Sequence, residues 1–344
     1  MSDRIRIAIV GAGAIARAYV EAIAEVSDVE LAAVVDIRDT AATELAELAS
    51  KRAAAPATFG EIQSLLVSGM KIDAALVSTP PVTHPGVCET LMRAGLAVLC
   101  EKPLCITSAD AERLVSVSEE TGVVFTMATK FRFVGDVVEA KTLLDAGTIG
   151  EIVLFENAFT GRVDMTQRWN SDPAVSGGGV LIDNGTHSVD LIRHFLGPIE
   201  AVQALEGPRV QPLAVEDTVQ IFCRTRSGAA CTVDLSWSID KHRATYVEVF
   251  GSEGVLKLGW KGGQIKQHDE SDWRSFGRGY GKVEAFANQI VDFAGAVRGE
   301  HAARVSPADA LASVRVVEAA QRTMGSDGWQ RIDVPAVSEP VVAK

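Results

Sequence analysis

The chain is poor in cysteine, and no two of its cysteines form a Cys-x-x-Cys pair. The five present are Cys88, Cys100, Cys105, Cys223 and Cys231. An odd number of scattered cysteines in a chain of 344 residues excludes a disulfide scaffold. Such thiols are typical of a reducing compartment, so we expect them to be free and buried.

The chain also lacks a long apolar run and a cluster of positive charge. No segment reaches the roughly 18 apolar residues of a membrane-spanning helix, and the first residues lack the apolar length and flanks of a signal peptide. There are 33 Lys and Arg against 45 Asp and Glu, a net charge of −12, without a basic stripe that could follow a phosphate backbone. We therefore expect a soluble cytoplasmic protein with neither a membrane nor a nucleic-acid partner.

The first part of the chain alternates short apolar runs with longer helical patterns. The expected strands are residues 6–10, 31–36, 74–78, 97–101 and 123–127. The expected helices are residues 14–26, 40–53, 61–66, 84–94 and 108–120. Near-continuous apolar strands separated by helices predict a doubly wound parallel sheet, an α/β Rossmann domain over residues 1–128.

The rhythm changes after about residue 150, where strands follow one another through short turns. The expected strands are residues 151–159, 218–225, 229–237, 245–251 and 255–258, and the expected helices are residues 135–146, 178–195, 282–297 and 307–324. This pattern predicts an α+β domain over residues 129–344, with a large, open, mainly antiparallel sheet that serves substrate binding and oligomerisation. The tail from Val334 to Lys344 has little periodicity, and we expect it to be poorly ordered.

A dinucleotide fingerprint follows the first strand. Residues 11–16 read Gly-Ala-Gly-Ala-Ile-Ala, the G-x-G-x-x-G/A pattern in which Gly11 makes the tight turn and Gly13 admits the pyrophosphate. Ala14 and Ile15 open the helix whose N-terminus would face the anion. Asp36 ends the second strand, where an acid accepts hydrogen bonds from the ribose hydroxyls and favours NAD. Arg38 could instead pair with a 2′-phosphate, which leaves NADP possible.

Two further strands end in residues suited to the cofactor crevice. Ser78, Thr79 and Pro80 close one strand, and His84 begins the next helix, either as a plain helix residue or as a cofactor contact. Glu101-Lys102-Pro103 closes another strand, so the Lys102 ammonium is expected at the crevice with Glu101 beside it. A surface ion pair is the alternative for this lysine.

A helix in the second half carries an acid and a histidine on one face. Asp183 and His187 are four residues apart and follow the glycine run 177–179. An imidazole titrates near neutral pH and therefore suits general acid–base chemistry. The two could also be metal ligands, but no third ligand stands at a suitable spacing, so we predict no metal.

Together these motifs resemble the Gfo/Idh/MocA oxidoreductases, and the resemblance extends to the turn 249–254 and the final helix. The family implies a Rossmann domain and a C-terminal sheet that is often an oligomer interface, so a homodimer or homotetramer is expected. It implies NAD-dependent oxidation or reduction of a sugar, amino sugar or cyclitol. Carried over, Lys102, Asp183 and His187 would be the catalytic trio. One departure is Lys130, where many members have Asn or Arg.

Other residues are expected to contact the substrate. Lys130, Arg132 and Trp169 fall in loops or at strand ends near the pocket, with Arg162 and Arg168 close by in the sequence. Basic side chains favour an acidic or phosphorylated sugar. The acids Asp164 and Asp172 lie among them, however, so that a neutral polyol or an amino sugar is equally compatible.

Two other functions remain open on the sequence alone. A glycosidase could use bound NAD to oxidise a sugar transiently, without net NADH formation. A regulatory protein could bind NAD without catalysis, but it would have no need for Lys102, Asp183 and His187 together.

Overall fold

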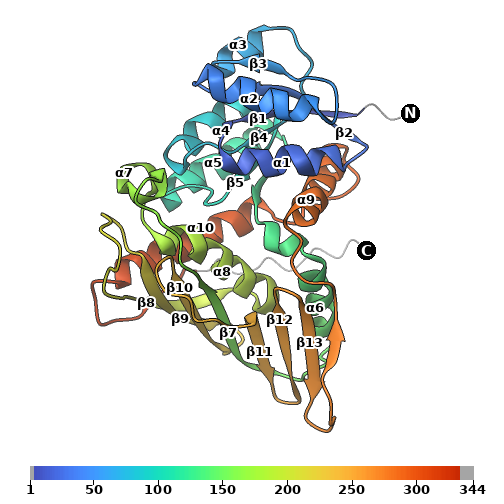
Figure 1. Cartoon of the computed structure of the whole chain (residues 1–344). Helices are drawn as coiled ribbons and strands as arrows, with labels where there is room; N and C mark the ends of the chain where they lie inside the picture. Colours follow the sequence, from blue (N-terminus) through green and yellow to red (C-terminus); the bar gives the residue numbers. More distant parts are fainter. Residues whose placement is uncertain (1–3, 334–344) are drawn as a thin grey trace.

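The computed structural model describes residues 4–333 and contains two sheets, one above the other in Figure 1. The expectation of a poorly ordered tail at residues 334–344 lies outside the described residues. The strands and helices expected from the sequence are all present, with ends that agree within three residues.

The upper sheet is parallel, with strand order β3-β2-β1-β4-β5-β6. Its strands are β1 (Ile5–Val10), β2 (Val29–Val35), β3 (Ala57–Phe59), β4 (Ala74–Val77), β5 (Ala97–Glu101) and β6 (Phe125–Ala128). Helices cover both faces: α1 (Ala14–Ala24), α2 (Asp39–Ser50), α3 (Ile62–Val67), α4 (His84–Arg93) and α5 (Ser108–Thr121). The predicted doubly wound sheet is confirmed; β3 was not predicted, because its three residues are too few for a periodic pattern.

A helix from the far end of the chain also packs on this sheet. Helix α9 (Lys282–Val297) lies against α1, and its Phe286, Ile290 and Phe293 are buried in the core beside β1. The core of the first half is therefore completed by the second. The proposed division at residues 128/129 stays a prediction; it marks where the chain passes from one sheet to the other.

The lower sheet has nine strands in the order β14-β13-β12-β11-β7-β10-β9-β8-β15. Their bounds are β7 (Ile152–Thr160), β8 (Ile199–Glu206), β9 (Thr218–Thr225), β10 (Ala230–Ser236), β11 (Thr245–Gly251), β12 (Gly254–Gly259), β13 (Gly262–Gln267), β14 (Arg274–Phe276) and β15 (Gln330–Arg331). The predicted mainly antiparallel sheet is confirmed, with one parallel pair, β7 with β10, at its centre. The sequence patterns did not predict β8, β13, β14 or β15.

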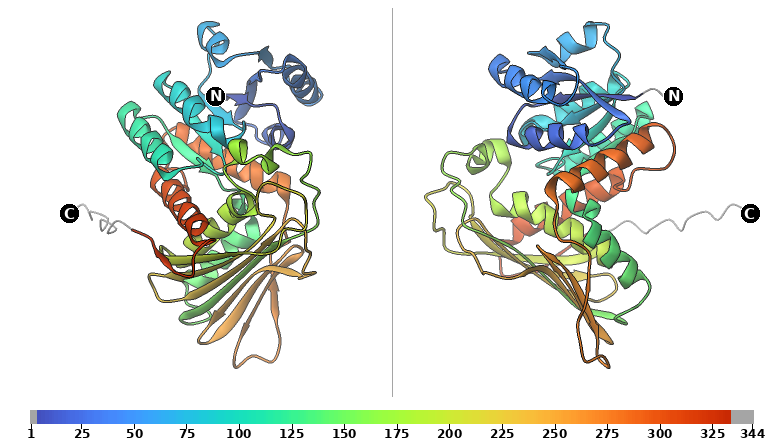
Figure 2. Two further views of the ribbon diagram at one scale, coloured as in Figure 1. Left: turned by 90° about the vertical axis from the view of Figure 1, so that its left-hand side faces the viewer. Right: turned by 45° about the vertical axis from the view of Figure 1, so that its right-hand side comes forward.

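Helices cover one face of the lower sheet, the face turned toward the parallel sheet (Figure 2). They are α6 (Gly135–Asp145), α8 (Val180–Leu196) and α10 (Pro307–Thr323), with the short α7 (Pro173–Ser176) on the connection before α8. Since α8 crosses beneath the carboxyl ends of the parallel strands, residues of both halves meet there.

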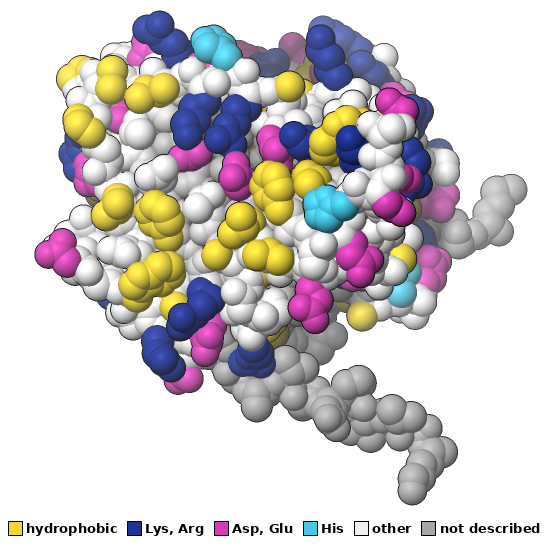
Figure 3. Space-filling model, turned by 90° about the horizontal axis from the view of Figure 1, so that it is seen from below, with side chains coloured by type: hydrophobic (Ala, Val, Ile, Leu, Met, Phe, Trp, Pro, Cys, Tyr) yellow, Lys and Arg dark blue, Asp and Glu magenta, His cyan; other side chains and the backbone are white. Residues whose placement is uncertain are grey.

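The opposite face of the lower sheet is open among the described residues. Hydrogen-bonded register aligns Val255, Phe250, Leu154 and Ala230 in one row across four strands. Charged side chains such as Glu156 and Lys257 occupy the neighbouring rows. Figure 3 shows hydrophobic side chains gathered between charged ones on this lower surface.

Two composition-based expectations can be compared with the structure. All five cysteines are free and buried, as predicted. Within residues 4–333, no helix combines the length and the apolar composition that crossing a membrane requires.

Candidate active site

The turn after β1 is shaped to receive an anion. Gly11 has φ +98°, and a Cβ there would lie 2.8 Å from backbone atoms of Ser78 and Thr79, so only glycine fits. Gly13 is the N-cap of α1 and makes no side-chain cap hydrogen bond, and a Cβ there would meet nothing within 4 Å. Open space at a helix N-terminus whose amides lack a side-chain partner fits the pyrophosphate of a dinucleotide.

Asp36 lies one residue beyond β2 and braces this turn. Its carboxylate accepts hydrogen bonds from the backbone N–H of Ala12 (2.7 Å) and of Arg38 (2.9 Å), and it pairs with the Arg38 guanidinium at 3.2 Å. Burial alone would raise the pKa of Asp36, but these hydrogen bonds outweigh burial and lower it. A carboxylate that stays ionised suits a ribose hydroxyl and repels a 2′-phosphate, while Arg38 is 64% exposed and free to move aside.

A cavity of about 580 Å³ runs from this turn to α8. The predicted site residues that line it are Gly13, Ala14, Ile15, Ser78, Thr79, Glu101, Lys102, Lys130, Trp169, Asp183 and His187. They come from the turn after β1 and the start of α1, from the ends of β4, β5 and β6, from the 3-10 helix η3 (Trp169–Ser171) before α7, and from α8. The structure thus gathers residues of both halves, distant in sequence, around one hollow.

The Lys102 ammonium joins the two halves inside this cavity. Its Nζ donates a hydrogen bond to the Asp183 carboxylate and another to the Asp183 carbonyl oxygen at 3.2 Å. Glu101, immediately before it, is buried and accepts hydrogen bonds from the Tyr19 hydroxyl (2.6 Å) and from the backbone N–H of Lys102 (3.0 Å). Burial raises the pKa of Glu101 despite these donors and the nearby ammonium groups. Lys102 is therefore held at the crevice by a carboxylate from α8.

His187 lies one turn after Asp183 on α8 and is 8% exposed. Its ring stands edge-on to Phe131, with centroids 5.1 Å apart, and its buried Nδ1 has no hydrogen-bond partner. Burial, reinforced by the charges of Lys102 and Lys130, lowers the pKa of His187 well below its usual value. The imidazole is consequently neutral near pH 7 and able to accept a proton.

Lys130 begins the short 3-10 helix η2 (Lys130–Phe133) after β6. Its Nζ lies over three aromatic rings, those of Phe131, Tyr280 and Phe286, at 5.4 to 5.8 Å from their centroids. Burial, with the like charge of Lys102, lowers the pKa of Lys130 to about 8. A second ammonium group thus faces the cavity.

Other predicted site residues lie outside the cavity. Four of them, Pro80, Gly11, Asp36 and Arg38, do not line it. Gly11 packs against the backbone of Ser78 and Thr79, and Asp36 holds the nucleotide turn through the backbone N–H of Ala12. His84 is fully buried, with Nδ1 3.0 Å from the Pro103 carbonyl oxygen and Nε2 2.8 Å from the Thr79 carbonyl oxygen. The cofactor contact considered for His84 is therefore corrected: its ring ties two loops of the crevice together.

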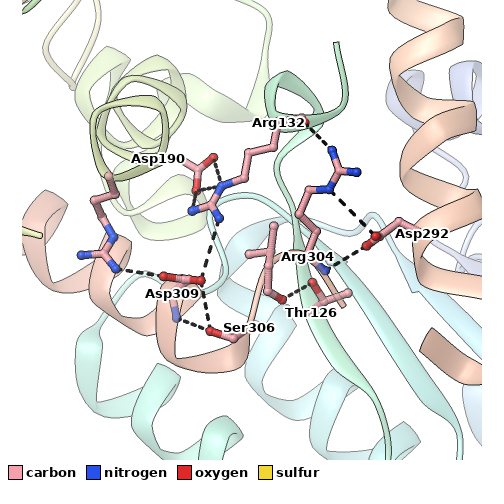
Figure 4. A network of polar contacts seen from close by, with 9 residues as sticks. Thr126, Arg132, Asp190, Asp292, Arg304, Ser306 and Asp309 are labelled. Carbon is pink, nitrogen blue, oxygen red and sulfur yellow. Dashed lines mark hydrogen bonds and ion pairs between the residues drawn. The ribbon is translucent and has the colours of Figure 1, made fainter. Parts of the chain in front are cut away.

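Arg132 also departs from expectation. Its guanidinium is 6% exposed and binds the 1% exposed carboxylate of Asp190 through three contacts of 2.7 to 3.0 Å. Figure 4 shows this pair at the centre of a network that reaches Asp309 at the start of α10. The substrate contact expected of Arg132 is corrected, because its charge is already neutralised in the protein interior.

Several cavity residues were missed or undervalued by the sequence patterns. Phe131, Phe159, Asn184, Trp260 and Lys282 line the cavity, and Tyr19 supports Glu101 from α1. Only Tyr19 carried a signal, a tyrosine on the apolar face of a helix, since a buried hydroxyl needs a partner. Arg168 lines the cavity but Arg162 does not, and Trp237 is a core residue at its border. In the described part of the chain, no three His, Cys, Asp or Glu side chains gather as a metal site would require.

Comparison with known proteins gives two family matches. The oxidoreductase family with an NAD-binding Rossmann fold matches residues 5–129, and the GFO/IDH/MocA C-terminal domain matches residues 137–257. The rhizopine catabolism protein MocA of Rhizobium meliloti is 28% identical, over 94% of this chain and 96% of its own length. The inositol 2-dehydrogenase of Rhizobium meliloti (strain 1021) is 27% identical, over 93% of this chain and 97% of its own length.

Solved structures share the whole architecture. GenD2 from gentamicin A biosynthesis, in complex with NAD, has a TM-score of 0.84 and 26% identity, covering 97% of this chain and 98% of its own. Levoglucosan dehydrogenase in complex with NADH has a TM-score of 0.87, covering 96% and 99%, and at 20% identity it shows the fold alone. The two family matches span most of the chain and fall on the two sheets described above. The chain therefore belongs to the Gfo/Idh/MocA family of NAD-binding oxidoreductases.

Proposed function

We propose that this protein transfers a hydride between NAD(H) and a secondary alcohol or ketone of a sugar or cyclitol. The observation that carries the proposal is the placement of the Lys102 ammonium, the Asp183 carboxylate and the His187 imidazole in one cavity that opens beside the nucleotide turn. The curated relatives named above, a cyclitol dehydrogenase among them, support the substrate class.

Each group of the proposed trio has a separate task. NAD⁺, when bound, supplies the hydride acceptor. The neutral His187 imidazole accepts the proton of the substrate hydroxyl, and in the reverse direction it returns the proton. The Lys102 ammonium stabilises the negative charge that develops on the same oxygen. Asp183 holds Lys102 in place and offers its remaining lone pairs to substrate hydroxyls.

The walls of the cavity strengthen these interactions. Phe131, Phe159 and Trp260 surround the His187 side with aromatic surface, which excludes water and lowers the local dielectric. In such surroundings a fixed ammonium stabilises developing charge more than it would in water. Trp169 is 46% exposed and lines the outer part of the cavity, where its ring can cover a sugar face.

Neither alternative function gains support from a specific contact. A regulatory protein would not require that an ammonium, a carboxylate and a neutral imidazole meet in one cavity. For a glycosidase, the measurement that decides is net NADH formation, because transient oxidation of the sugar would leave none.

We further propose that two or four copies associate through the open face of the nine-stranded sheet. The row Val255, Phe250, Leu154 and Ala230 supports this, since Leu154 is 46% exposed in the single chain. A cytoplasmic location is proposed from the five free, buried cysteines.

The proposed function is tested by following NADH formation with inositols, hexoses, uronic acids and amino sugars. Lys102→Ala should keep NAD binding but lose most of the turnover. The variant retains Asp183 but lacks the positive charge that stabilises the substrate oxygen as it loses its proton. Lys51→Ala, at an exposed position at the end of α2, is the matched control. Turnover near normal in Lys102→Ala would contradict the assignment.

A further inference from the structure

We propose that the substrate carries a carboxylate, and that Lys130 binds it, so that the natural substrates are acidic sugars or acidic cyclitols. This inference deepens the proposed function and rests on it for the reaction. The binding site can nevertheless be tested without turnover.

The first observation is a buried ammonium group that has no anion in direct contact. Lys130 Nζ lies against Phe131, Tyr280 and Phe286, and within residues 4–333 no carboxylate forms an ion pair or hydrogen bond with it. The other lysine at this edge, Lys102, is paired with Asp183. The charges of Glu101 and Asp183 favour the Lys130 ammonium without touching it, but burial and the charge of Lys102 outweigh them and lower its pKa. A buried charge that is compensated only in part is unfavourable, and a ligand can supply the missing partner. The cavity that Lys130 faces is where that partner would come from.

The second observation is that, in the described part of the chain, both carboxylates that line the cavity are already engaged, so that neither offers a free negative charge to a substrate ammonium. Asp183 is bound to Lys102, and Glu101 accepts from Tyr19 and from the backbone of Lys102. The two acids that left an amino sugar open, Asp164 and Asp172, do not line the cavity. Asp164 binds Thr166 and Asp172 caps α7 through the backbone N–H of Ala174.

Positive charge at the cavity, by contrast, exceeds what these acids neutralise. Lys282 and Arg168 also line it, and both are exposed at its edge. In a protein with a net charge of −12, a cavity with this excess attracts an anion.

The diphosphate of NAD is not the partner of Lys130. It is expected at the turn after β1, whereas Lys130 follows β6, which is three strands away in the order β1-β4-β5-β6. At about 4.8 Å between neighbouring strands, three steps separate the two places by roughly 14 Å. A single ammonium cannot serve both.

The surroundings of Lys130 favour a carboxylate over a phosphate. At this point of the cavity Lys130 offers one positive charge, because Lys102 is paired with Asp183 and Lys282 is exposed at the edge. A single ammonium enclosed by three aromatic rings matches a monoanion. A phosphate carries about two negative charges at neutral pH and is usually met by several cations or backbone amides. Phe131 touches both Lys130 and His187, so the carboxylate would lie close to the carbon that reacts.

The test is calorimetric titration of the NADH-loaded protein with matched ligands: glucose, galactose and mannose, their uronic acids, glucosamine, and glucose 6-phosphate. Wild type should bind at least one uronic acid about 10- to 100-fold more tightly than its parent hexose. Lys130→Met should remove that preference, Lys130→Arg should keep part of it, and Lys51→Met should leave it unchanged.

Each other outcome counts against the site. No preference for any acid, tighter binding of glucosamine or glucose 6-phosphate, or a preference that survives Lys130→Met would overturn the proposal. NADH formation is measured in parallel with the same ligands. Turnover of neutral sugars without a preference for acids would refute the Lys130 site and leave the proposed function standing. Binding of acids that depends on Lys130, without formation of NADH, would support the Lys130 site and refute the proposed function.

Discussion

The pair Arg132–Asp190 gives the sharpest prediction about how the two halves of the site are held together. Arg132 lies two residues after Lys130 in η2, and Asp190 lies three residues after His187 on α8. Both side chains are almost completely buried, and three hydrogen bonds join them. The pair therefore links the segment that carries Lys130 to the helix that carries Asp183 and His187 (Figure 4).

The perturbation is Asp190→Asn, which keeps the shape of the side chain and removes its charge. Breaking a buried ion pair from one side costs about 3–5 kcal/mol, because the other charge stays buried without compensation. Arg132 retains Asp309 at 3.8 Å, a partner with 36% side-chain exposure, so we expect the lower end, about 3 kcal/mol. The same substitution should raise KM more than it weakens NAD binding, since η2 and α8 shape the substrate side of the cavity.

The assay is denaturant unfolding of wild type, Asp190→Asn and the double variant Arg132→Met/Asp190→Leu, with NAD affinity measured alongside. The double variant removes both charges and should recover most of the lost stability. A loss below about 1 kcal/mol in Asp190→Asn would refute the reasoning, because it would mean that the Arg132 charge is solvated or compensated elsewhere.

Three further predictions concern single side chains of the site. Lys130→Met should stabilise the free protein at pH 7 by up to roughly 3 kcal/mol, because the folded pKa of about 8 lies below the ordinary 10.5. Since the unfolded chain binds more protons between those values, wild type should gain stability relative to Lys130→Met as the pH rises from 8 to 10.5, and a constant difference would contradict this. Burial holds the pKa of His187 well below its usual value, so protonation of His187 should not lower kcat/KM just below neutral pH. A fall of kcat/KM in that pH range that is absent in His187→Gln would contradict this. Asp36→Ser should lower the preference for NAD over NADP, measured as the ratio of the two kcat/KM values, since Arg38 would then be free to meet a 2′-phosphate; an unchanged ratio would remove Asp36 from cofactor selection.

Much of the fold was predictable because its signals are local. A strand covered on both faces must be apolar along its length, and a tight turn before a helix needs glycine. Residues 5–16 therefore predict both the first strand and the nucleotide turn. The spacing from this turn to Asp36 adds a second local signal. The short strands β3, β14 and β15 were not predicted, because two or three residues are too few to show an alternation of apolar and polar side chains.

The substrate side of the site could not be predicted to the same degree. Lys130 and Arg132 are two cations two residues apart, and the sequence treats them alike. The turn of η2 sends Lys130 over aromatic rings at the cavity and Arg132 into the interior against Asp190. Asp164 and Asp172 looked available for an amino group until the fold placed both in local hydrogen bonds.

The sequence by itself thus determined the Rossmann half and its cofactor, since the strand, the nucleotide turn and the acid after the second strand are local signals. The trio Lys102, Asp183 and His187 was implied by the family resemblance and stays a proposal. Only the tertiary structure decided which charges are neutralised and which face the cavity. That division depends on contacts between residues far apart in the chain, such as Lys102 with Asp183 and Lys130 with Phe286, and such contacts leave no trace in local spacing.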